Sequence, residues 1–246
     1  MRRRAVGRWR GGLATWLPGL LVFAALAGCG EVEPPPPPDE IVRRSLETMT
    51  ALPGFAFSIT RSGGPAFIDA GETISFSRAE GTYTAPDSAQ AAVRVVVPGL
   101  VAEISVIAIG DRYWETNLLT REWVEVPSDQ AFNPAALFDA AHGLPAILLD
   151  DLHTIALAES DQPFELEEVP GVEFYLVVAD LDTRDLHPLS FTLIGPEVAR
   201  VGLYVEPGTF LLHRLTITEP AAPDEEPSVW EVDFWDFGAT DEILPP

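Results

Sequence analysis

Residues 91–116 read AAVRVVVPGLVAEISVIAIGDRYWET, and this stretch decides the fold that the rest of the chain must share. Val93, Val95 and Val97 recur at every second position, as one apolar face of a strand requires. Between residues 100 and 109 apolar side chains occupy both alternating positions, so both faces of that strand must be covered. Gly110-Asp111 is typical of a tight hairpin turn. The stretch therefore predicts paired antiparallel strands with further structure packed over them.

Period-two patterns continue on both sides of this stretch and predict two sets of strands. The first set forms a meander of six or seven strands, and the second set follows residue 153. We expect hairpin turns at Pro170-Gly171 and across Glu206 to Thr209, where proline and glycine interrupt the apolar pattern. The further predicted strands are 55–60, 74–77, 80–83, 112–116, 123–126, 154–158, 165–168, 173–180, 201–205, 210–218 and 230–234.

Helical patterns are short and lie outside these strands. Asp39 to Leu52 places apolar residues on one face at a period near 3.6, with Asp39 as a candidate cap. Asn133-Pro134 is a typical helix start, and Leu144-Pro145 begins a second short helix after His142-Gly143. Thr183 to Ile194 predicts a short helix or a loop. The two short helices between the strand sets are suited to cover a sheet face or the mouth of a cavity.

The amino-terminal region carries an export pattern. Residues 1–10 hold five arginines and no acid, and about fifteen mostly apolar residues follow, against the ~20 of a membrane-spanning helix. Leu26-Ala27-Gly28-Cys29 closes this run, and Cys29 is the single cysteine of the chain. Small residues before a lone thiol are the pattern of a bacterial lipobox. We therefore predict a signal peptide over 1–28 and lipidation of Cys29, which would place the protein on the extracytoplasmic face of the cell membrane.

Five consecutive prolines, Pro34 to Pro38, follow the predicted lipidation site. Proline fixes φ and lacks a backbone donor, so residues 29–38 predict an extended polyproline tether. It would hold the folded body, residues 39–246, off the membrane. No linker interrupts those 208 residues, a length that fits one large domain or two small ones, and we expect a single domain.

The charge balance disfavours electrostatic binding to nucleic acid and to anionic lipid headgroups. The whole chain has 15 basic and 38 acidic residues and a net charge of −23, and every basic residue is arginine. Residues 1–28 hold five of the arginines and no acid, so the predicted mature part is still more acidic. Such a surface repels nucleic acid and anionic lipid headgroups.

The sequence lacks the residue patterns typical of catalytic and metal-binding sites. The chain contains no G-x-S-x-G elbow and no other short catalytic signature. Its four histidines are too scattered for metal-ligand spacing. Asp180, Asp182 and Asp185 come closest to a calcium loop, but the required glycine and distant glutamate are missing. We therefore predict a protein that is not an enzyme and has no metal site or cofactor.

Several segments, in order along nearly the whole predicted mature chain, resemble the LppX/LprAFG family of lipoproteins. They are Ile41 to Phe57, EGTYTAPD, AAVRVVV and ISVIAIGDRYWE within Glu80 to Glu115, FNPAALFDAAHGLPAILLDDL from Phe132, VPGVEFYLVVA from Val169, LYVEPGTFLLHRLTI from Leu203, and the terminal DEILPP. The resemblance implies an α+β fold related to the LolA/LolB carriers. In that fold a strongly curved antiparallel sheet, a half-barrel, is closed on its concave side by short helices around an apolar cavity for acyl chains.

The function implied is binding and transport of acylated lipids or glycolipids, with an envelope transporter as a further, unidentified partner. A solid core between sheet and helices would use the same apolar residues, so an adhesion or assembly scaffold with a filled core stays open as the alternative. The pocket residues that we predict are Phe55, Phe57, Ile74, Phe76, Val93, Val95, Ile104, Val106, Trp114, Leu137, Phe138 and Leu148.

Overall fold

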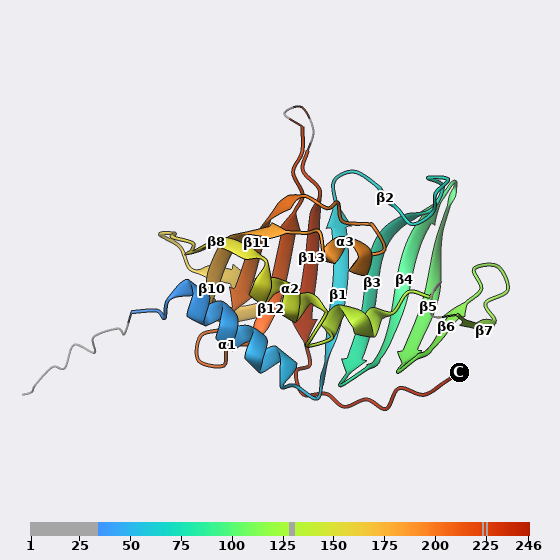
Figure 1. Cartoon of the computed structure of the whole chain (residues 1–246), viewed down its shortest axis with the longest axis horizontal. Coiled ribbons are helices and arrows are strands. Elements are labelled where there is room, and N and C mark those ends of the chain that lie inside the picture. Colours follow the sequence, from blue (N-terminus) through green and yellow to red (C-terminus); the bar gives the residue numbers. More distant parts are fainter. Residues whose placement is uncertain (1–33, 128–130, 223, 225) are drawn as a thin grey trace, which may run out of the picture. The chain divides into compact units, whose positions relative to one another are not determined.

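An open, curved antiparallel sheet is the main element of the computed structural model, which describes residues 34–127, 131–222, 224 and 226–246 (Figure 1). Residues Pro36–Pro246 form one compact unit. The strands are β1 (Gly54–Ser62), β2 (Ala66–Phe67), β3 (Ser75–Thr84), β4 (Ser88–Val97), β5 (Leu100–Ile109), β6 (Arg112–Thr116), β7 (Trp123–Val126), β8 (Leu152–Leu157), β9 (Phe164–Leu166), β10 (Val169–Asp182), β11 (Val198–Val205), β12 (Leu212–Thr218) and β13 (Val229–Trp235).

The two predicted sets of strands join in the middle of this sheet. The strand order is β7-β6-β5-β4-β3-β1-β13-β12-β11-β10-β8, with β2 beside β3 and β9 beside β10. The junction is the pairing of β1 with β13, in which Phe57 lies opposite Phe234. Antiparallel pairs place opposite residues on the same face, so the apolar alternation of both strands builds one continuous face. The predicted α+β class with a curved antiparallel sheet is confirmed.

One predicted hairpin turn was wrong. Pro170 and Gly171 lie inside β10, and the chain reverses before them, since Val169 already pairs with Leu166. Gly171 has a φ of +81°, and the register of β9 and β10 shifts between Val169 and Phe174. Gly171 therefore allows an irregularity within strand β10. Because turns also favour glycine at positive φ, the sequence pattern is the same for both.

Four short helices lie on the face of the sheet that is nearer the viewer in Figure 1. They are α1 (Pro38–Thr50), the 3₁₀ helix η1 (Pro134–Phe138), α2 (Leu144–Asp150) and α3 (Leu186–Leu189). Asn133 caps η1 as predicted, because its side chain accepts hydrogen bonds from the amides of residues 135 and 136. Asp39 does not cap α1, which begins one residue earlier at Pro38 and has no side-chain cap.

Small residues allow η1 to approach one half of the sheet closely. η1 contacts β3, β4 and β5, whose inward positions include Ala79, Gly81, Ala89, Ala91 and Ala108. At Gly81 the neighbouring strand also requires a glycine, because a Cβ there would stand 2.1 Å from the backbone oxygen of residue 90 on β4. The helical layer and this part of the sheet are therefore in direct contact.

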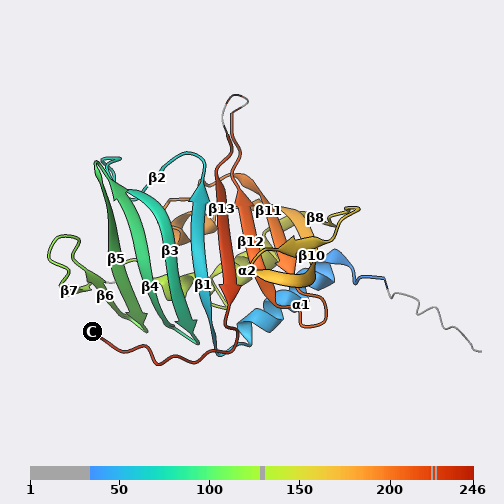
Figure 2. The same cartoon turned by 180° about the vertical axis from the view of Figure 1, so that it is seen from behind.

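The opposite face of β5 and β6 carries a small apolar cluster of its own. Ile107 and Trp114 pair across the two strands and pack with Ile243. The carboxy-terminal segment reaches this place along the lower edge of the sheet in Figure 2, and the Thr84 hydroxyl donates to the Asp241 carbonyl over 3.0 Å. The end of the chain thus covers the second face of β5 around Ile107, whereas Val101, at the other end of the same face, is 58% exposed.

The predicted signal peptide and Cys29 lie outside the described residues. Among the helices that are described, none combines the length and the apolar character needed to cross a membrane.

Candidate functional site

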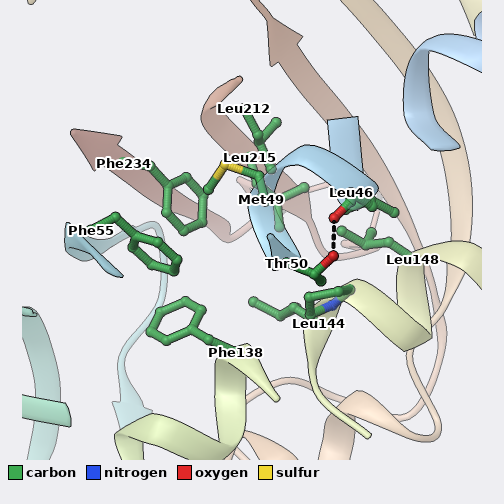
Figure 3. A pocket seen from close by; sticks show the side chains of 11 residues that line it. Leu46, Met49, Thr50, Phe55, Phe138, Leu144, Leu148, Leu212, Leu215 and Phe234 are labelled. Carbon is green, nitrogen blue, oxygen red and sulfur yellow. Dashed lines mark hydrogen bonds between the residues drawn. The ribbon is translucent and has the colours of Figure 1, made fainter. Parts of the chain in front are cut away.

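Two apolar cavities lie between the sheet and the helical layer. The first has a volume of about 30 Å³ and lies between α1, α2, η1 and strands β1, β12 and β13 (Figure 3). Its lining residues are Leu46, Met49, Thr50, Phe55, Phe138, Leu144, Pro145, Leu148, Leu212, Leu215 and Phe234.

The second cavity has a volume of about 70 Å³ and lies beneath α3 and the segment that follows it. It is lined by Ile59, Phe76, Ala79, Phe132, Leu137, Leu144, Leu186, Ser190, Leu193, Ile194, Ile217, Trp230 and Val232. Thr50 and Ser190 supply the polar side chains in the two linings, and both hydroxyls donate to backbone oxygens of their own segments. The spaces thus offer a ligand hydrocarbon contacts rather than polar partners.

Leu144 separates the two cavities, since it is the residue that contributes to both linings among those described. Its position is set by the turn before α2. A Cβ on Gly143 would lie 2.7 Å from the Ala136 carbonyl oxygen and from two backbone atoms of Asp139, so only glycine fits without displacing backbone. The Asp139 carboxylate accepts from the amides of Ala141 and His142 and tightens the same turn.

An aromatic cluster joins η1 to the sheet beside the first cavity. The ring of Phe138 lies 5.1 Å from Phe55, 4.8 Å from Phe57 and 5.4 Å from Tyr83, between ring centroids. Burial raises the pKa of Tyr83, and the nearby negative charges of Asp139 and Asp87 add to this shift. Offset and edge contacts of this kind contribute about 0.5–1.5 kcal/mol per pair beyond the buried area. Phe138 therefore packs η1 against the aromatic side chains at the centre of the sheet.

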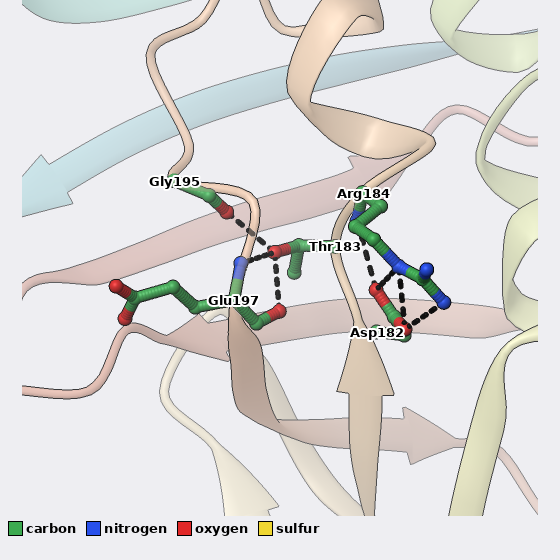
Figure 4. Close-up of polar contacts among 5 residues, drawn as sticks. All are labelled: Asp182, Thr183, Arg184, Gly195 and Glu197. Atoms are coloured by element: carbon green, nitrogen blue, oxygen red, sulfur yellow. Dashed lines mark hydrogen bonds and ion pairs between the residues drawn. The ribbon is translucent and has the colours of Figure 1, made fainter.

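A buried threonine fixes the base of the segment that covers the second cavity. The Thr183 hydroxyl shares its one proton between the carbonyl oxygens of Gly195 and Glu197, which lie 2.5 and 2.6 Å away, and it accepts from the Glu197 amide at 2.9 Å (Figure 4). Thr183 is 1% exposed. The chain between residues 183 and 197 is thus closed into a loop that presents Leu186, at its first turn, to the cavity.

A second polar contact ties this loop to the central strands. Glu219 accepts from the Gly195 amide at 3.1 Å and from the Trp230 indole at 3.0 Å. Arg61 lies 3.3 Å from the same carboxylate, and both side chains are largely buried. Trp230, a wall of the second cavity, is held in place by this contact.

Five of the twelve predicted pocket residues line a cavity. Phe55, Phe138 and Leu148 line the first, and Phe76 and Leu137 line the second. Five others face the same side without lining either space. Phe57, Val93, Ile104 and Val106 belong to the surrounding core or pack against it. Val95 is fully buried and pairs with Phe76.

Two predicted pocket residues lie elsewhere, and their assignment is corrected. Trp114 pairs with Ile107 and lies on the opposite face of the sheet. Ile74 precedes β3 and is outside the core cluster, because its amide is held by the Asp69 carboxylate at 2.6 Å in a turn.

The sequence reasoning missed the contributions of α1, α3 and the last two strands. The alternation of Trp230, Val232 and Phe234 was a usable signal, since paired central strands share one apolar face. The residues around α3 gave no such signal, because their place above the sheet depends on the contacts of Thr183 and Glu219.

Two acidic side chains of the calcium-like pattern form ion pairs with arginines instead of a cluster of metal ligands. No group of three or more histidine, cysteine or acidic side chains suited to a metal ion occurs within the described ranges. Asp180 and Asp182, from the calcium-like pattern, are paired with Arg200 and Arg184, and these contacts lower the pKa of each carboxyl.

Comparison with known proteins identifies the fold. No family model and no curated protein sequence matches this chain. The solved structure of LprF from Mycobacterium bovis superposes with a TM-score of 0.63 at 16% identity, over 85% of this chain and 96% of that one. Lipoprotein LppX from Mycobacterium tuberculosis gives 0.56 at 12% identity, over 84% and 98%. The chain has the fold of these two proteins, and the resemblance to LppX/LprAFG lipoproteins is thereby confirmed for the fold.

Proposed function

We propose that this protein is a membrane-tethered, non-enzymatic lipoprotein that binds and transports acylated lipids between its sheet and its helical layer. The observation that carries the proposal is the pair of apolar cavities separated by the Leu144 side chain beneath short helices. The shared fold with LprF and LppX supports it.

The apolar lining fits the energetic requirement of a carrier. Exposing a palmitoyl-length chain to water costs on the order of 13 kcal/mol, at ~0.8 kcal/mol per methylene group. A protein that replaces the apolar contacts of the bilayer removes most of this cost.

The two cavities are too small to hold an acyl chain in the closed structure. Small-molecule pockets are about 300–1,000 Å³, and both cavities are much smaller. An acyl chain can therefore enter only when the layer formed by η1 and α2 moves away from the sheet. These elements are five and seven residues long, so a few contacts, chiefly those of Phe138 and Leu144, oppose the movement.

The predicted lipidation of Cys29 supplies the location in this proposal. A diacylglyceryl group on Cys29 and the proline-rich tether would keep the domain at the extracytoplasmic surface of the membrane, where acylated lipids or glycolipids are available. A transporter in the envelope would deliver or accept the lipid.

The small volumes favour a second candidate, an adhesion or assembly scaffold with a filled core. The two functions differ in what the native protein carries. We would extract natively purified protein with organic solvent, analyse the extract by mass spectrometry, and titrate the protein with a fluorescent acyl probe. The carrier predicts co-purified acylated lipid and saturable probe uptake. Absence of both, together with a cross-linked protein partner, would establish the scaffold instead.

A further inference from the structure

The β4–β5 hairpin ends in an uncharged tip that projects from one edge of the sheet. Residues 95–102 read VVVPGLVA and contain no polar or charged side chain. Leu100 is 59% exposed, Val101 58% and Val96 41%. In Figure 1 this hairpin lies at the upper right, away from α1 and α2. Large aliphatic side chains are thus presented to solvent at one place.

Strand β2, which pairs with β3 on the side away from β4, adds two exposed apolar side chains near the hairpin tip. Phe67 and Ile68 are 38% and 42% exposed. Phe67 pairs with Ser75, which pairs with Val96, which pairs with Val101, so these residues form a row on one face across four strands. We call Phe67, Ile68, Val96, Leu100 and Val101 the apolar tip.

The apolar tip is apolar on both faces of the hairpin. Val96 and Val101 occupy one face, and Val97 and Leu100, the next pair toward the turn, occupy the other. A protein partner that docks on a sheet covers one face, whereas a hydrocarbon layer surrounds a hairpin end on both faces. Eight consecutive residues without charge, in a chain of net charge −23, are also compatible with the uncharged hydrocarbon interior of a membrane.

We infer that the apolar tip inserts into the surface of a lipid bilayer. Because insertion rests on apolar contacts, the inference extends to zwitterionic membranes and needs no anionic headgroup, which the acidic surface would repel.

The tip is continuous with the candidate site. Phe76 lines the second cavity and pairs with Val95, which pairs with Ala102. Val97 and Leu100 lie two residues farther along the same face of their strands. This face would allow an acyl chain to pass from a membrane to the cavity along apolar side chains, a consequence that rests on the proposed function.

The test uses a local reporter in the full chain. Cys29→Ala removes the native thiol, and Val101→Cys then carries an environment-sensitive NBD label, with phosphatidylcholine vesicles as the probe. Asp111→Cys, in the turn at the other end of β5, is the matched label position. We expect NBD emission at position 101 to rise and shift to the blue with vesicles, and emission at position 111 to stay unchanged. Any membrane binding by residues 1–28 is common to both.

Substitutions identify the cause of the signal. Val96→Ser with Leu100→Ser should weaken the vesicle dependence at position 101 by about tenfold or more, because aliphatic area leaves the inserted surface. Leu119→Ser, which replaces an 89% exposed leucine in the β6–β7 loop, should leave it unchanged.

Three results would overturn the inference: no change at position 101, an equal change at position 111, or a change that depends on protein concentration without vesicles, which would indicate pairing of two copies. Uptake of the acyl probe from solution is measured on the same preparation. If the protein inserts into vesicles but takes up no acyl probe, the carrier function is refuted and membrane insertion of the tip is not. If it takes up the probe but does not insert, membrane insertion is refuted and the carrier function is not.

Discussion

Replacing Leu144 by alanine should destabilise the protein while improving its capacity to bind an acyl chain. Leu144 is 6% exposed and stands between cavities of about 30 and 70 Å³. Removal of three carbon atoms loses ~2 kcal/mol of transfer free energy. About 50 Å³ of added void costs ~1 kcal/mol more, at ~24 cal/mol per Å³. We therefore expect a loss of about 3 kcal/mol, within the range of ~2–5 kcal/mol found for such substitutions.

The same substitution joins the two cavities. A single longer space should accept an acyl probe with less displacement of the helical layer, so the probe should bind more tightly than to the unaltered protein. Bound ligand stabilises the folded state by ~2.7 kcal/mol at a hundredfold excess over its dissociation constant. A saturating probe should thus restore most of the stability that Leu144→Ala removes.

The assay is equilibrium urea unfolding with and without the acyl probe. Leu181→Ala is the matched control, because Leu181 is fully buried on β10 and lines neither cavity. It should lose a similar stability without a gain in probe affinity. If the probe stabilises both variants equally, or if Leu144→Ala binds it no better than the unaltered protein, Leu144 does not divide a lipid site.

Three other features give direct predictions. Gly143→Ala should cost about 1–3 kcal/mol in urea unfolding, because its Cβ meets backbone. Gly64→Ala should change little, because its Cβ would lie 4.0 Å from the Ser228 hydroxyl oxygen, an ordinary contact. Thr183→Val should cost about 1–3 kcal/mol by leaving buried backbone groups unpaired, and hydrogen exchange of the Glu197 amide should accelerate. The pKa of Asp69 is lowered from its ordinary value of 3.8, chiefly by the Thr73 hydroxyl. The ionised carboxylate therefore stabilises its turn above pH 3.8, and this stabilisation is lost as the pH falls below that value. Hydrogen exchange of the Thr73 amide should then accelerate relative to other turns, and unchanged exchange would contradict this.

The strands could be predicted because their evidence is local. A period-two pattern fixes which side chains share a face, and short turns fix which strands pair, as Glu206 to Thr209 does between β11 and β12. The 3₁₀ helix was also predictable, since Asn133-Pro134 contains both its cap and its first residue. The curvature of the sheet came from the family resemblance and not from these patterns.

The strand register of the β5–β6 hairpin predicts the face on which Trp114 lies, and it contradicts the assignment of Trp114 to the pocket. With Gly110-Asp111 as a two-residue turn, Ile109 opposes Arg112 and Ile107 opposes Trp114. Trp114 must then share the face of Ile107, which is opposite to that of Val106. What covers this face, Ile243 from the carboxy terminus, depends on contacts distant in sequence and has no local signal.

The sequence does not predict how much space lies between the apolar faces of the sheet and the helices. A structure in which this space is nearly filled is still compatible with a carrier, because an empty cavity is costly in free energy. An empty apolar cavity of ~300 Å³ would cost ~7 kcal/mol at ~24 cal/mol per Å³, a large part of the 5–15 kcal/mol that stabilises a typical domain. A ligand-free carrier therefore gains by letting its helical layer settle onto the sheet, as Phe138 and Leu144 do here. An entering acyl chain contributes ~0.8 kcal/mol per buried methylene, so about nine methylenes offset that opening cost. On this reasoning shorter chains should bind weakly, and affinity should rise steeply with chain length beyond this point, whereas a filled scaffold core would show no such threshold.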